Sequence, residues 1–306
     1  MDNLTHSLVG LALASGLKRR TRGRALTLVV AANLPDLDGL SYLFGDRLDG
    51  LAFRRGWTHG VLAMVVLPLL LAALVWTGQR WSSRESDRMH GKELLLLAAL
   101  GVWSHPLLDL LNTYGVRLLM PFSSHWFYGD ALFIVDPWVW LCLGSGILVE
   151  RVLQARSRPA RARQAAGWSL ALAAGYAVVQ VVAGRVSADF VARGTGAAPG
   201  QRILAAPVFA NPFRRTVIRD LGDRYELGRL SLLPAMRYEA TAEISKGLSE
   251  AGDVGNTLTG KRFLRWSRFP VFAVEPGSGG RRVQISDLRY SRPGQPSWAG
   301  VTVQLR

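Results

Sequence analysis

Cysteine is almost absent from this chain, which has 306 residues and a single cysteine, Cys142. One cysteine excludes a disulfide framework within the chain and a metal site built from thiolates. Cys142 lies in an apolar run, where we expect it to be a small buried side chain. A basic segment before the first apolar stretch is also missing, so we expect no cleavable signal peptide.

Acidic residues are few, because 22 Asp and Glu stand against 37 Lys and Arg, and the net charge is +15. A charge of this size can indicate nucleic-acid binding. Here, however, the arginines crowd into short loops between apolar runs, which is the distribution that the positive-inside rule gives to membrane proteins. We therefore expect the lipid bilayer, and no nucleic acid, as the partner of this chain.

Long apolar runs are confined to the first 185 residues, and a mean hydropathy of +0.16 is too low for a chain embedded in a membrane throughout. Residues 1–185 are predicted to form an α-helical integral membrane bundle of about six spans. The first run would be about 21 Å long as a helix, short of a bilayer core of roughly 30 Å. The six runs are Leu4–Leu17, Ala25–Phe44, Gly60–Thr77, Glu93–Leu111, Leu132–Val149 and Gly167–Gly184.

Residues 186–306 are predicted to form a second domain, which is small, β-rich and outside the membrane. Short alternating runs there are bounded by Gly, Pro, Asn and Asp, a pattern typical of β-strands. We expect strands at Arg215–Arg219, Arg281–Ile285 and Gly300–Leu305, and a short helix at Glu239–Ala251.

The loop charges predict an orientation. Loops 18–24, 78–92 and 150–166 hold 14 Lys and Arg, whereas loops 45–56 and 112–130 hold 4. The two sets alternate along the chain, as six spans require, and the basic set marks the cytoplasmic side. We therefore expect the N-terminus and the C-terminal domain to be extracytoplasmic.

The polar residues of the membrane half gather at the outer ends of the predicted spans. His105 and Asp109 are four residues apart, so they share one face of a helix. Imidazoles and carboxylates in one layer are suitable ligands for a divalent metal, with zinc favoured, and two ions together can activate water. The residues in this layer are His6, Asp36, Asp38, His59, His105, Asp109, Asp130 and Asp136.

Simpler interpretations exist for several of these residues. His105 and Asp109 would also suit a hydrogen-bonded pair that only holds helices together, since buried polar groups in membranes are costly. Asp36 follows Pro35 and would suit a plain turn or helix cap. His90, in a charged loop, and His125, among aromatic residues, are interpreted as surface and interfacial side chains.

Several motifs together resemble the membrane-bound metal-dependent hydrolase family, the YdjM/YbcI-like inner-membrane proteins. The resemblance covers the membrane half in order. Its motifs are Met1–Gly10, Asn33–Asp38, Arg55–His59, Ser104–Asp109, Tyr114–Gly115, Leu119–Phe122 and Asp130–Pro137, with a weaker match at Asn211–Phe213 and Trp266–Pro270.

The resemblance implies a multi-pass protein of the bacterial inner membrane, distantly similar to zinc phospholipases C and single-strand nucleases. It implies one to three zinc ions, held by His6, Asp36, His59, His105 and Asp109. Those distant relatives also use a free N-terminal amine and a later H-x-x-x-E pair. This chain lacks such a pair, and Asp130 or Asp136 would stand in for it.

These observations favour a metal-dependent hydrolase that acts at the outer membrane face on a phosphoester or another ester of a lipid or envelope substrate. Asp36 or Asp38 would bridge metals or act as the general base. Two other functions stay open. A metal or proton transporter would use intramembrane His and Asp along its path, and a non-catalytic scaffold would use the outer domain to bind an envelope partner.

Overall fold

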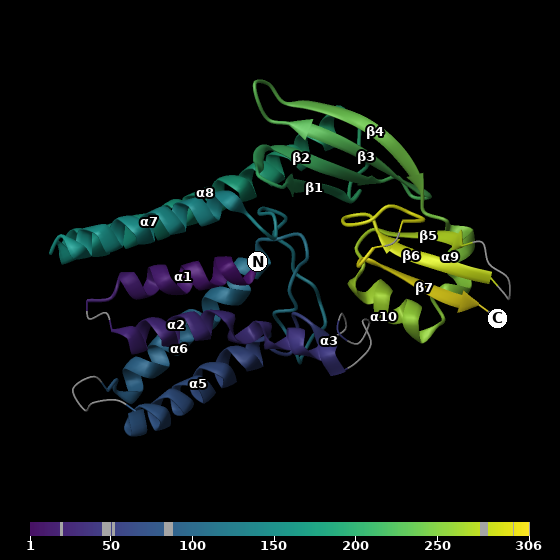
Figure 1. The fold of residues 1–306 in the computed structure, drawn as a ribbon. Helices are drawn as coiled ribbons and strands as arrows, with labels where there is room; N and C mark the ends of the chain where they lie inside the picture. The colour runs from purple at the N-terminus through teal and green to yellow at the C-terminus, as the bar shows by residue number, and fades with distance from the viewer. Residues whose placement is uncertain are drawn as a thin grey trace. The chain divides into compact units, whose positions relative to one another are not determined.

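The computed structural model describes residues 1–18, 21–44, 50, 53–82, 88–275, 281–295 and 297–305. The chain divides into two compact units (Figure 1). The helical unit comprises Met1–Gly39 and Arg55–Ala183, and the β-rich unit comprises Leu40–Arg54 and Gly184–Arg306. The predicted basic loop residues Arg19, Arg20 and Arg84, together with Arg47, lie outside the described residues.

Three helices pack closely at the centre of the helical unit. α2 (Arg22–Asn33) lies against both α1 (Asn3–Ser15) and α6 (Gly91–Leu110). Glycines allow this approach, because a Cβ on Gly10 would lie 3.0 Å from the Leu28 carbonyl oxygen and a Cβ on Gly101 would lie 2.4 Å from the Ala31 Cβ. This packing brings the end of α2 beside the last turns of α6.

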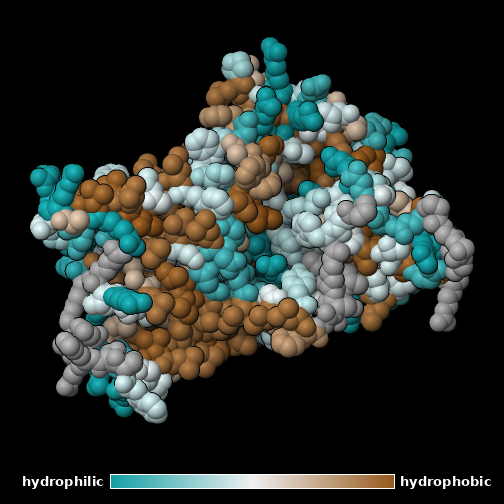
Figure 2. Space-filling model, viewed as in Figure 1, coloured by the Kyte–Doolittle hydropathy of each residue, from teal (hydrophilic) through white to brown (hydrophobic). Residues whose placement is uncertain are grey.

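Four described helices are long and apolar enough to cross a membrane: α5 (Val61–Ser82), α6, α7 (Pro137–Ala155) and α8 (Pro159–Gly194). Their outward sides are apolar, as the brown surface of Figure 2 shows over α5, where Leu69 is 51% and Leu74 68% exposed. α1 and α2 have only 13 and 12 residues. Six full-length spans are therefore not confirmed.

The predicted second span, Ala25–Phe44, is broken. Its α-helix ends at Asn33 and continues as the 3-10 helix η1 (Leu34–Leu40) and the short α3 (Ser41–Phe44). Pro35 explains the change, because proline has no N–H and restricts the residue before it. The break places Asp36 and Asp38 on η1 instead of a regular helix.

The predicted fifth span begins later than Leu132. Asp136 is the N-cap of α7 and Pro137 its first residue, a combination that starts helices efficiently. α8 is longer than the predicted Gly167–Gly184, with 36 residues, and continues as helix to Gly194 beyond the expected domain boundary.

The β-rich unit contains two antiparallel sheets with orders β1-β2-β3-β4 and β5-β6-β7. Their bounds are β1 Ile203–Val208, β2 Asn211–Asp220, β3 Arg224–Ser231, β4 Arg237–Ser245, β5 Pro270–Glu275, β6 Arg281–Asp287 and β7 Gly300–Leu305, with helices α9 (Leu248–Val254) and α10 (Leu258–Trp266). One core joins the sheets, since Ile218 and Tyr225 pack with Phe269 and Val271. The end of α8 covers the first sheet through Val191.

The three predicted strands are confirmed, and Gly300–Leu305 has the expected bounds. The predicted helix at Glu239–Ala251 is wrong for its first half, which is strand β4. Residues 237–245 pair with β3 along their length, with Ile244 opposite Tyr225. Alternation at period two prevails there, and Gly247, with φ of 66°, separates this strand from α9.

Candidate metal centre

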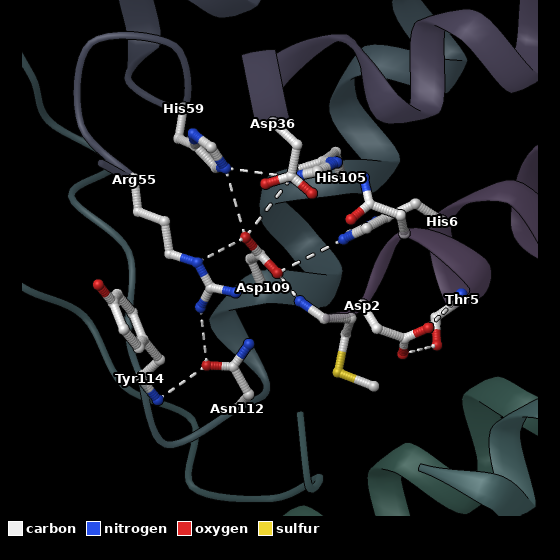
Figure 3. A network of polar contacts seen from close by, with 12 residues as sticks. Asp2, Thr5, His6, Asp36, Arg55, His59, His105, Asp109, Asn112 and Tyr114 are labelled. Carbon is white, nitrogen blue, oxygen red and sulfur yellow. Dashed lines mark hydrogen bonds and ion pairs between the residues drawn. The ribbon is translucent and has the colours of Figure 1, made fainter. Parts of the chain in front are cut away.

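Four side chains converge at one end of the helical unit. The ligand atoms of Asp36, His59, His105 and Asp109 all lie within 4.8 Å of one another (Figure 3). Asp36 comes from η1, His59 from the turn before α5, and the other two from consecutive turns of α6. The side chains of His59, His105 and Asp109 are fully buried.

The separations of these atoms suit one tetrahedral cation. His59 Nε2 lies 3.1 Å from His105 Nε2 and 3.3 Å from Asp109 Oδ2. His105 Nε2 lies 3.5 Å from that same oxygen and 3.6 Å from Asp36 Oδ1. Zinc bonds of about 2.0–2.1 Å to nitrogen and oxygen require donor atoms about 3.3–3.4 Å apart.

Both of these imidazoles present Nε2 to the centre, because their other nitrogens are engaged elsewhere. His105 Nδ1 lies 2.7 Å from the backbone oxygen of Ala32, an acceptor, so it carries the proton. His59 Nδ1 lies 2.9 Å from Thr58 Oγ1 and 3.4 Å from Asp38 Oδ2. Two unprotonated Nε2 atoms 3.1 Å apart repel each other unless a cation lies between them.

The protonation states of His59 and Asp38, which lie outside the membrane helices, also favour a bound cation. Burial is the main cause that lowers the pKa of His59, to about 4, so this imidazole is neutral near pH 7. Burial would raise the pKa of Asp38, but the hydrogen bond and charge of His59 and the N–H of Arg55 outweigh it and hold the pKa below its ordinary value. A neutral imidazole beside a carboxylate is the form that binds metal.

His6 borders the group without belonging to the four. Its ring stacks on His105 with centroids 3.7 Å apart, and its Nε2 lies 3.5 Å from Asp109 Oδ1. Within the part of the chain that the structure describes, neither ring nitrogen of His6 has a hydrogen-bond partner, although the side chain is fully buried. The Met1 amine also contacts Asp109 Oδ1. One oxygen of Asp109, Oδ1, therefore faces Met1 and His6, whereas Oδ2 faces the two other histidines of the centre.

Asp38 lies behind His59 instead of facing the four donors. Its Oδ2 accepts hydrogen bonds from the Arg55 N–H at 2.7 Å and from Thr58 Oγ1 at 2.9 Å, and it also contacts His59 Nδ1. A carboxylate in this place fixes the orientation and tautomer of a metal-binding histidine.

The structure does not bring Asp130 and Asp136 into the group. Asp136 accepts hydrogen bonds from the backbone N–H groups of Trp138 and Val139, as the N-cap of a helix does. It also accepts one from the Tyr176 hydroxyl. Asp130 has a φ of 51°, a turn conformation that aspartate tolerates better than most residues. The pattern Asp-Pro at the head of an apolar run is a capping signal as well as a ligand candidate.

Arg55 is the residue of this centre that reasoning from the sequence missed. It is 3% exposed, and its Nε lies 3.2 Å from Asp109 Oδ2. Arg55 was counted as a loop charge and included in the motif Arg55–His59, but was not assigned to the site. Its place four residues before His59 is the signal that separates it from the other loop arginines. His90 and His125, interpreted as surface residues, are both exposed.

The fold and the site define a helical membrane protein with a buried His/Asp centre near one end of its bundle. The family model described as YdjM inner membrane protein matches residues 1–186, so the chain belongs to this family. It is 33% identical over 129 residues to the Escherichia coli (strain K12) protein called inner membrane protein YbcI, a match that covers 41% of this chain and 70% of that protein.

A second relative is the Bacillus subtilis (strain 168) protein called uncharacterized protein YfhP. It is 23% identical over 150 residues, which are 46% of this chain and 43% of that protein, so less than half of its length is matched. No solved structure matches the chain. The family model covers the residues of the centre, whereas the β-rich unit lies largely outside it.

Proposed function

We propose that this protein is a metal-dependent hydrolase of the bacterial inner membrane. The observation that carries the proposal is the set of two Nε2 atoms and two carboxylates at tetrahedral spacing, with the imidazole protons held on the opposite side of each ring. When bound, a divalent cation, with zinc favoured, supplies Lewis-acid activation of water and stabilisation of a leaving oxygen.

The protein's own groups have distinct tasks in this proposal. His59, His105, Asp109 and Asp36 would hold the cation, and Asp36, 8% exposed at its side chain, is the ligand nearest to solvent. This position would also let Asp36 accept the proton from the attacking water. Asp38 would position His59. A second cation would use His6 Nε2 and the other oxygen of Asp109, within the expected range of one to three ions.

The substrate would be an ester, and we favour a phosphoester of a lipid or envelope molecule. The phosphoester preference follows the resemblance to zinc phospholipases C and single-strand nucleases. Lipid access is favoured by exposed apolar side chains beside the ligands, including Leu37 at 54% and Trp57 at 49%.

The experiment compares two histidines of the helical unit. The full chain is purified in detergent, its zinc content is measured, and hydrolysis of a panel of nitrophenyl phosphoesters and carboxylic esters is followed. We expect His105→Ala to lose zinc and activity, whereas His125→Ala, at an exposed position, keeps both. Unchanged zinc in His105→Ala would contradict the site. Zinc uptake into proteoliposomes without hydrolysis of any ester would instead favour a transporter.

The proposed orientation has a separate test. Both the N-terminus and the β-rich unit are expected outside the cytoplasm, from the alternation of loop charges. In a Cys142→Ser background, a cysteine replacing exposed Arg202 should react in intact spheroplasts with a membrane-impermeant maleimide, and one replacing exposed Arg156 should react only after lysis. Labelling of the Arg156 position in intact spheroplasts, and of the Arg202 position only after lysis, would show that the orientation is the opposite of the one proposed.

A further inference from the structure

We propose that Arg55 is a specificity-determining residue that makes this centre select substrates whose reacting group carries a negative charge. The preferred class would be phosphoesters over neutral carboxylic esters. The inference rests on the proposed hydrolase function and deepens it.

Arg55 borders the donor set directly. Its Nε lies 3.2 Å from Asp109 Oδ2, the same oxygen that lies 3.3 Å from His59 Nε2 and 3.5 Å from His105 Nε2. The guanidinium charge therefore lies next to the point where two imidazoles and a carboxylate meet. A group bound at this point would lie within a few ångströms of a permanent positive charge.

The side chain is fixed in this position. Arg55 Nη1 donates to Asn112 Oδ1 at 3.0 Å and to the Gly115 carbonyl at 3.3 Å, and its guanidinium carbon lies 4.5 Å from the centre of the Tyr114 ring. Figure 3 shows the guanidinium between Asp109 and Asn112. A fixed, buried charge stabilises developing negative charge without having to reorient during the reaction.

The backbone of Arg55 is held as firmly as its side chain. Its φ of 53° is in the left-handed region, which is unusual for arginine. Its N–H donates to Asp38 Oδ2, and its carbonyl accepts from the Arg117 N–H at 2.8 Å. Backbone conformations of this kind concentrate at functional sites, where the surrounding contacts maintain them.

The charge balance explains why this arginine would select anions. Asp36, Asp38 and Asp109 contribute three negative charges, which one divalent cation and the Met1 amine beside Asp109 would balance. Arg55 then leaves the centre with one net positive charge. Without it, an anionic substrate would approach a centre of no net charge in a buried region where salt screens weakly. A neutral ester would be affected far less.

The test uses the full chain in detergent, loaded with zinc, and two substrates that share the nitrophenol leaving group: bis(4-nitrophenyl) phosphate and 4-nitrophenyl butyrate. We expect Arg55→Gln to lower kcat/KM for the phosphate about 10- to 100-fold relative to the butyrate, the value of one charged contact. Arg55→Lys keeps the charge but loses the stacking on Tyr114 and the planar donor group, so it should lower that ratio less than Arg55→Gln does. Lys92→Gln, an exposed charge at the far end of α6, is the matched control.

Binding of inorganic phosphate to the zinc-loaded protein gives a second readout by calorimetry. Arg55→Gln should weaken it at least about tenfold at unchanged zinc stoichiometry. Equal losses on both substrates in Arg55→Gln and Arg55→Lys, or unchanged phosphate binding, would overturn the inference and leave Arg55 as a counter-ion of Asp109. A wild type that binds phosphate through Arg55 but cleaves neither ester would count against the hydrolase alone.

Discussion

Asp38 contacts His59 from behind and is not one of the four donors of the centre. Substituting it by asparagine therefore tests whether Asp38 only positions His59 or binds the metal itself. Asp38→Asn keeps the size of the side chain and one acceptor oxygen, which can still receive hydrogen bonds from Arg55 N–H and Thr58 Oγ1. What it removes is the negative charge 3.4 Å from His59 Nδ1. The four donor atoms of the centre are untouched.

The expected loss follows from this geometry. A cation held at Nε2 of His59 by a bond of about 2 Å would lie roughly 7 Å from the Asp38 carboxylate. At an effective dielectric constant of about 20, a doubly charged ion and a carboxylate at that distance attract by about 5 kcal/mol, an upper limit before desolvation. Losses measured for such supporting carboxylates are about 10- to 100-fold in metal affinity, or about 1.4–2.7 kcal/mol. We expect Asp38→Asn in this range.

The assay is a competition titration of zinc between the detergent-purified, metal-free protein and a chromophoric chelator. Asp38→Asn should bind the wild-type number of ions with weaker affinity, whereas Asp36→Asn, which alters a donor, should lose more. An affinity within threefold of wild type would refute the positioning role. Loss of a whole equivalent of zinc in Asp38→Asn, with Asp36→Asn unaffected, would make Asp38 the ligand. Circular dichroism of both variants controls for folding.

Three further predictions concern the support of the centre and the second unit. Asp136→Ala should cost about 1 kcal/mol of stability as a lost N-cap and leave zinc stoichiometry unchanged, and loss of zinc there would restore Asp136 as a ligand. Gly101→Leu should disrupt zinc binding through packing, because even a Cβ would lie 2.4 Å from the Ala31 Cβ, and intact affinity would contradict the close approach of α2 and α6. Asp287→Asn should destabilise the β-rich unit by about 3–5 kcal/mol, since the buried carboxylate pairs with Arg289 at 2.9 Å, and urea unfolding measures this loss. Burial would raise the pKa of Asp287, but Arg289 outweighs it, so the stabilisation is present above about pH 4 and should disappear as the pH falls through the lowered folded pKa.

Local patterns made much of the fold predictable. The long apolar runs correspond to α5, α6, α7 and α8, and alternating runs became strands β2, β6 and β7. Local pattern failed where two signals compete within a few residues. A short helix was expected over Glu239–Ala251, yet its first part pairs with β3 and forms a strand, because cross-strand contacts override weak local preferences.

The length of an apolar run did not by itself predict an unbroken helix. Ala25–Phe44 has the length of a span, but Pro35 divides it, and the resulting 3-10 helix η1 carries Asp36 toward the centre. The proline that interrupts this predicted span therefore also places a candidate ligand. Such local exceptions to the rules of regular structure are common at functional sites.

That a histidine and an aspartate share one face of α6 follows from the sequence alone, because a spacing of four residues fixes this in any helix. The apolar runs also indicated the four helices that are long enough for a bilayer, although they did not show that Ala25–Phe44 is broken. Contacts in three dimensions were needed to show which nitrogen of His59 faces the centre, that Asp38 lies behind it, that Asp136 caps a helix and that Arg55 reaches Asp109. Those outcomes depend on contacts between segments far apart in the chain, and no local spacing encodes the direction in which two such side chains meet.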